Sequence, residues 1–183
     1  GGGQRSGWRT ANSGSMNAWV AQRADKALQE ARAGNPKALD RLMRVALPFN
    51  RPHRIGIIEV NEEAVKVSLP ERRSNRNHLG GMHACAIATA LEFSSGASVL
   101  IELGMRDYRI IMSRIEVDYL AKPQGNCTAT SKRNTPEVQG LSDVLQKEGV
   151  ARVQLSAALH DARGEHCAQA LVHWHLKVWG NRG

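Results

Sequence analysis

The segment from Met82 to Leu103 is almost entirely apolar, and it limits what this chain can fold into more than any other feature. A helix that is apolar on every side has no polar face to present to water, so we expect this segment to form a buried helix. It contains His83 and Glu92, and these polar residues argue against a membrane span. The expected structure therefore has one long helix at its centre, covered on most sides by other elements.

Alternation of apolar and polar residues on both sides of this helix predicts strands. Before it, the alternating segments 55–58 and 64–69 flank the short turn 61–63 and predict a hairpin. After it, four strands are expected, near residues 114–119, 127–133, 152–160 and 168–178. The polar segment 134–149 between the second and third of these is expected to be a loop with one helical turn. An antiparallel β-sheet wrapped around a single long central helix is an α+β structure, the hotdog fold.

Hydrophobic residues make up 42% of the 183 residues in periodic segments, so the chain is globular and long enough for one domain. Residues 1–15 are rich in Gly and Ser and are expected to be a disordered tail or a non-native leader. Residues 16–50 have helical periodicity and form an expected helical lead, in which Asn35 caps a second helix and Pro36 begins it. The hotdog domain is expected to span residues 51–180.

The net charge of +8 comes mainly from residues 16–54, where eight Lys or Arg face three carboxylates. Nucleic acid is not expected as a partner, because the chain has only two Phe and two Tyr and no interleaving of aromatic with basic residues. A polyanionic small molecule such as CoA would use the same charge. Three widely spaced cysteines (Cys85, Cys127 and Cys167) and no visible secretory signal predict reduced thiols and a cytoplasmic location.

The segment from Asn77 to Glu92 is the one that suggests chemistry. A polar loop containing Gly80 and Gly81 leads into the start of the apolar helix, where the first N–H groups have no partner within the helix. Such donors can stabilise the oxyanion of a thioester. Glu92 lies deeper in the same helix, and a lone carboxylate is costly to bury unless it has partners or a task.

The spacing Asn77-x-x-Gly80-x-x-His83, with an acidic residue nine positions later, resembles the hotdog acyl-CoA thioesterases of the phenylacetate-pathway type. It is most similar to a branch with an added helical lead, and the resemblance covers residues 50–179. It implies that Asn77 holds the attacking water or the carboxylate. It also implies that His83 and the Ala84 N–H polarise the thioester carbonyl, with Gly81 beside the substrate. Glu92 would be the general base or the nucleophile, and the reaction would need no metal and no cofactor.

The chain differs from the usual motif at two places. Ala84 and Cys85 stand where two glycines are typical, and the acid is Glu rather than Asp. A helper hydroxyl on the next strand has Ser113 as its nearest candidate. These differences keep a second function open, a non-catalytic domain that binds acyl-CoA or an acyl carrier. A hotdog hydratase would need a His and acid pair in another loop arrangement, which the sequence does not show.

Other residues have alternative interpretations. Arg72, Arg73 and Arg76 could bind CoA phosphates or be an ordinary solvated loop. Cys85 is expected to be a small buried hydrophobe rather than a nucleophile. No metal site is expected, because His173 and His175 share a strand face without an acidic partner at ligand spacing.

The expected site also predicts an oligomer. Ala84 and Glu92 are eight residues apart, which is about 12 Å along a helix, too far for both to act on one carbon. A homodimer, or a dimer of dimers, would combine the helix start of one protomer with Glu92 of another.

Overall fold

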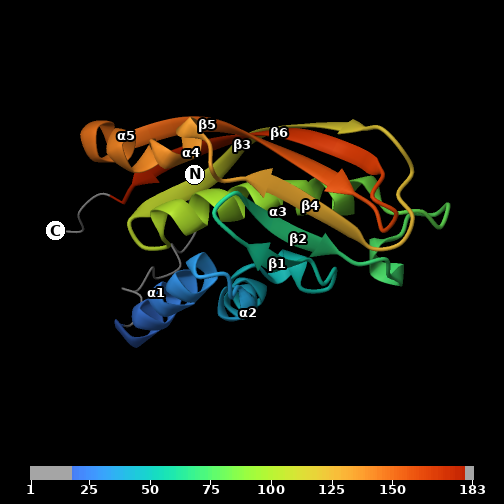
Figure 1. Cartoon of the computed structure of the whole chain (residues 1–183), viewed down its shortest axis with the longest axis horizontal. Coiled ribbons are helices and arrows are strands. Elements are labelled where there is room, and N and C mark those ends of the chain that lie inside the picture. Colours follow the sequence, from blue (N-terminus) through green and yellow to red (C-terminus); the bar gives the residue numbers. More distant parts are fainter. Residues whose placement is uncertain (1–17, 180–183) are drawn as a thin grey trace, which may run out of the picture.

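The computed structural model describes residues 18–179, and the expected tail at residues 1–15 lies outside them. One antiparallel sheet of six strands has the order β1-β2-β4-β5-β6-β3. Its strands are β1 (Gly56–Val60), β2 (Ala64–Leu69), β3 (Tyr108–Tyr119), β4 (Cys127–Lys132), β5 (Val150–His160) and β6 (His166–Val178). The central helix α3 (Ala84–Leu103) packs against five of them, β2 to β6 (Figure 1). The predicted order, a hairpin followed by the long helix and four strands, is confirmed.

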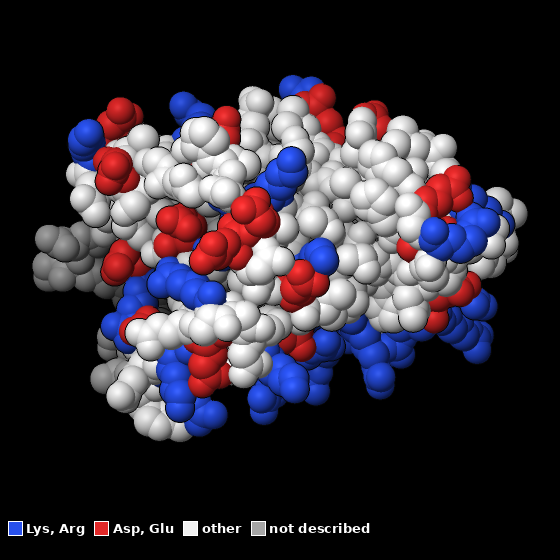
Figure 2. All heavy atoms as spheres, in the orientation of Figure 1, with Lys and Arg blue, Asp and Glu red and all other residues white. Residues whose placement is uncertain are grey.

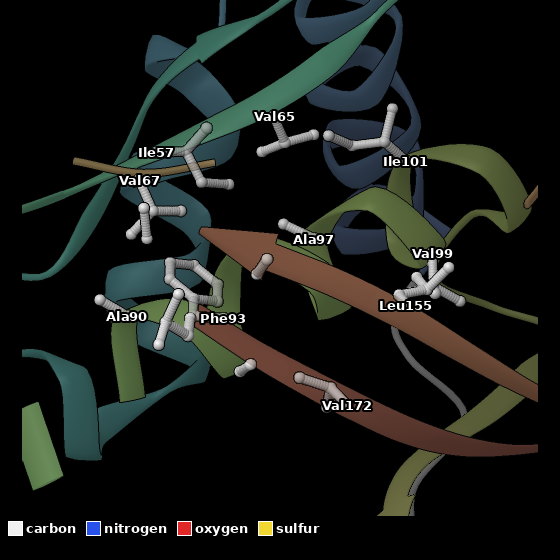
Figure 3. Close-up of a cluster of buried hydrophobic side chains, with 14 of the residues drawn as sticks. Ile57, Val65, Val67, Ala90, Phe93, Ala97, Val99, Ile101, Leu155 and Val172 are labelled. Atoms are coloured by element: carbon white, nitrogen blue, oxygen red, sulfur yellow. The ribbon is translucent and has the colours of Figure 1, made fainter. Parts of the chain in front are cut away.

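The core lies between α3 and the inner face of the sheet. In β2, Val65, Val67 and Leu69 are fully buried, while the residues between them are half-buried. Strands β5 and β6 alternate in the same way, and their inner residues reach the helix. Figure 3 shows Phe93 of α3 between side chains from both halves of the sheet. Length and composition alone would allow α3 to cross a membrane, but most of its side chains are buried in this core.

One strip of α3 is not covered by the sheet. Ala84 and Cys85 are exposed at the first turn, and Thr89 and Glu92 farther along are half-buried. The expectation of a buried Cys85 is therefore wrong. The reason is that the first turn of α3 extends past the covering strands, so apolar composition alone does not bury every residue there.

The helical lead forms two helices, α1 (Ala18–Arg32) and α2 (Lys37–Ala46), as predicted. Asn35 Oδ1 accepts a long hydrogen bond of 3.4 Å from the Lys37 N–H, and Pro36 precedes the first residue of α2 instead of beginning it. The helical lead packs into the same hydrophobic core as the sheet and α3. Its buried residues in this core are Ala27, Leu28, Ala31, Leu39 and Met43.

Two expectations about the second half of the chain were incomplete. The segment expected to be a loop contains two helices, α4 (Pro136–Gln139) and α5 (Leu141–Glu148). They form because Val138, Leu141 and Leu145 recur at helical spacing and are buried, although the segment is polar on average. Strand β3 begins at Tyr108, six residues before the predicted 114–119, and a register shift between Met112 and Arg114 interrupts its alternation.

Candidate functional site

The loop that precedes α3 is closed by hydrogen bonds from a single asparagine. Asn77 Oδ1 accepts from the N–H groups of Leu79 (3.0 Å) and Gly81 (3.1 Å), and the Asn77 N–H donates to the Gly81 carbonyl. Gly80 has φ +75°, a conformation that favours glycine. Within residues 18–179 the Asn77 side-chain NH₂ has no hydrogen-bond partner, so it can donate to a ligand or water.

His83 caps the first turn of α3. Its Nδ1 accepts a hydrogen bond of 3.0 Å from the Cys85 N–H, and its carbonyl accepts from Ala86 and Ile87. Because Nδ1 is the acceptor, neutral His83 carries its proton on Nε2 and can donate from there. The Ala84 N–H is then the one amide of this turn without a partner among the described residues. An oxyanion could accept from this amide.

Two side chains from the end of β3 and the segment after it complete the surroundings of the loop. The Tyr119 hydroxyl donates to the Ala84 carbonyl at 3.0 Å, which fixes the position of the first turn. Lys122 lies over the loop, because its Cε would be 3.1 Å from a Cβ added at Gly81. No sequence pattern indicates either residue, since only the curvature of the sheet brings β3 to this loop.

Glu92 is half-buried on the uncovered strip of α3. Its carboxylate makes no hydrogen bond or ion pair with another described residue. Burial raises the pKa of Glu92 from 4.5 to about 7. A carboxylate with this pKa is able to exchange protons near neutral pH.

Ala84 and Glu92 lie on the same unbroken helix. Eight residues of α-helix separate them by about 12 Å along the axis. Within one protomer they therefore cannot both reach the carbonyl carbon of one thioester.

The other residues expected near the substrate have different environments. Gly81 lies in the loop beside Asn77, and Arg76 pairs with Glu71 at 3.0 Å. Arg72 and Arg73 make no side-chain hydrogen bond or ion pair within the described chain. Ser113 is exposed at the irregular point of β3, and its hydroxyl donates to the His173 carbonyl.

The histidines of β6 do have an acidic neighbour, which the sequence did not reveal. His173 Nε2 lies 3.1 Å from Glu116 Oε1 across the β3–β6 pair. A separate group, Asp161, Glu165 and Cys167, has three potential ligand atoms close together. Asp161 already accepts hydrogen bonds from three backbone N–H groups, which lower its pKa to about 2 despite its burial. This carboxylate holds the β5–β6 turn.

A sheet curled around one buried helix, with a glycine loop at the start of that helix, defines a protein of the hotdog-fold class. Within that class, residues 35–176 match the model of the family described as a domain of unknown function, DUF4442, and the chain belongs to this family. No curated protein matches the chain by sequence.

Solved structures share this fold at low sequence identity. One is a protein of unknown function from Pseudomonas aeruginosa described as a probable thioesterase, with TM-score 0.67, 20% identity and coverage of 75% of this chain and 92% of that one. Another is a protein of unknown function from Chlorobaculum tepidum, with TM-score 0.70, 13% identity and coverage of 86% and 98%. A thioesterase from Haemophilus influenzae has TM-score 0.63, 11% identity and coverage of 80% and 92%.

Proposed function

We propose that this protein hydrolyses acyl-CoA thioesters in the cytoplasm. The observation that carries the proposal is Glu92, a half-buried carboxylate without a partner in the described chain and with a pKa of about 7. The unpartnered Ala84 N–H at the start of the same helix supports it. The three free cysteines fit a reducing compartment.

In the proposed reaction, Glu92 removes a proton from water, and the water oxygen attacks the thioester carbonyl. Alternatively, the carboxylate attacks directly and water hydrolyses the resulting anhydride. In both cases negative charge develops on the carbonyl oxygen, where the Ala84 N–H and the helix dipole stabilise it. The carbon–sulfur bond then breaks and CoA leaves as the thiolate. Asn77 would position the water or the carboxylate with its free NH₂ group.

We further propose that each site uses two protomers. Strand β3 lies at one edge of the sheet and carries exposed apolar side chains at Ile111, Met112 and Tyr119. An exposed edge strand of this length has backbone N–H and C=O groups that can pair with a strand of another chain. A two-fold dimer would bring Glu92 of one protomer to the Ala84 turn of the other and would form two equivalent sites.

The direct test measures thiol release from a panel of acyl-CoA esters. We expect wild type to hydrolyse at least one of them, and Glu92→Gln to lower kcat by about 10²–10⁴-fold while the fold is kept. Glu148→Gln, at the exposed end of α5, is the matched control and should retain full activity. Retention of most of the activity in Glu92→Gln would remove this carboxylate from the mechanism.

A non-catalytic domain that binds acyl-CoA is the second candidate. It is favoured by Ala84 and Cys85, whose side chains lie beside the free amide, where the acyl-CoA thioesterase motif that this segment resembles typically has glycines. Tight acyl-CoA binding by wild type without any thiol release would support this candidate over the enzyme.

A further inference from the structure

Two adjacent loops that are separated in the sequence carry four arginines. Arg51 and Arg54 belong to the turn between the lead and β1, and Arg72 and Arg73 belong to the segment that enters η2 (Arg73–Asn75). Ser74 Oγ donates to the Pro52 carbonyl at 3.1 Å, so the two loops lie side by side.

Asn75 holds this arrangement in place. It is fully buried, and its side-chain NH₂ donates to the carbonyls of His53 and Pro70, both at 2.9 Å. Its Oδ1 lies 2.8 Å from His53 Nδ1. A buried amide with all its partners is rigid, because breaking any of these bonds leaves a polar group unsatisfied.

The backbone at Arg54 is in an unfavourable conformation. Its φ is +53°, and it is the one residue other than glycine with positive φ among residues 18–179. Such a conformation costs of order 1 kcal/mol and persists where the surrounding structure imposes it, often at ligand clamps. Here the turn is imposed by its bonds to η2 on one side and by buried Ile55 on the other.

No carboxylate of residues 18–179 forms an ion pair with any of the four guanidinium groups. None makes a side-chain hydrogen bond or ion pair within the described chain, and Glu71, the acidic residue next to Arg72, is paired with Arg76. Figure 2 shows a row of Lys and Arg along the lower edge of the molecule, below α2 and β1. Positive charges carried on adjacent loops raise the local concentration of anions.

The arginine loops are also connected directly to the proposed active site. The carbonyl of Asn75 accepts a hydrogen bond of 2.8 Å from the N–H of His83, the residue before Ala84. Two hydrogen bonds through Asn75 thus join the Arg51–Arg54 turn to the start of α3. The loops that carry the arginines therefore lie next to the turn that carries the free Ala84 N–H.

We propose that Arg51, Arg54, Arg72 and Arg73 bind the phosphate groups of a CoA thioester. The planar guanidinium fork matches phosphate oxygens, and the pantetheine arm would run from these loops to the Ala84 amide. This inference rests on the proposed function for its substrate, and it adds to the site two arginines from the turn between the helical lead and β1.

The test uses Arg54→Gln/Arg73→Gln, with Arg152→Gln on β5 as the matched control. Binding of free CoA is measured by calorimetry, and kcat/KM is measured for one acyl group carried either by CoA or by N-acetylcysteamine, which has no phosphate. We expect Kd for CoA to rise about tenfold in the double variant, with no change in the control. The ratio of kcat/KM for the CoA ester to that for the phosphate-free ester should fall by a similar factor. Arg54→Lys/Arg73→Lys should restore part of the affinity.

The outcomes separate this inference from the proposed function. Equal CoA affinity in wild type and in a folded Arg54→Gln/Arg73→Gln variant would overturn it, as would failure of wild type to bind CoA. CoA binding that depends on the arginines, in a protein that hydrolyses no thioester, would leave the inference standing and remove the enzymatic proposal.

Discussion

At the scale of single residues, Glu92 links stability and activity to pH. Its pKa is about 7 in the folded protein against 4.5 ordinarily. Between these values the unfolded chain has released the proton and the folded protein still holds it. Folding stability therefore falls as pH rises from about 4.5 to 7 and levels off above 7. The Glu92→Gln variant has no titrating group at this position. The Tm of the variant minus the Tm of wild type should therefore increase as pH rises from about 4.5 to 7.

Activity should have the opposite dependence on pH. The reaction needs ionised Glu92, so kcat/KM should fall as pH drops below about 7. Thermal melts and initial rates over the same buffers measure both effects. A Tm difference that does not vary between pH 4.5 and 7 would contradict the raised pKa.

Ala84 tests whether the first turn is open to the substrate. Its methyl group lies beside the free N–H, so Ala84→Gly should raise kcat/KM for bulky acyl groups. The same change should lower stability by about 0.5–1 kcal/mol, because glycine is a poorer helix former. If no ester in the panel is hydrolysed faster, the methyl group does not limit access.

At the scale of elements, Arg32 ties the lead to the central helix. Its guanidinium donates to the carbonyls of Ile101 and Glu102 at the end of α3, at 2.9 and 3.1 Å. Arg32→Met keeps the aliphatic stem and removes these bonds, so the free energy of unfolding should fall by about 1–2 kcal/mol. Urea denaturation measures this, with Gln22→Met on the exposed side of α1 as control. If the urea midpoints of Arg32→Met and Gln22→Met are equal, the hydrogen bonds of Arg32 do not contribute to stability.

Most elements were predictable because their patterns are local. Strands β2 and β6 alternate between buried and more exposed residues, since each has one face on α3. The start of β3 was not predictable, because Ile110, Ile111 and Met112 are consecutive apolar residues, although Ile111 and Met112 are exposed and the register shifts directly after them. Helices α4 and α5 were missed because only a narrow stripe of each is buried.

The sequence predicts only those parts of the site that lie close together along the chain. Loop, cap and carboxylate lie within Asn77–Glu92, so their spacing is visible in the sequence. The contacts of Tyr119, Lys122 and the Arg51–Arg54 turn depend on how distant segments meet. No local pattern contains that information.

At the scale of the whole molecule, the proposed thioesterase site is shared between two protomers. Subunit mixing tests this sharing: Asn77→Ala and Glu92→Gln, each expected to be inactive alone, are refolded together. Random pairing makes about half of the dimers mixed, each with one intact site, so about a quarter of wild-type activity should return. If the mixture stays inactive while native mass spectrometry shows mixed dimers, the two groups do not act across a dimer interface.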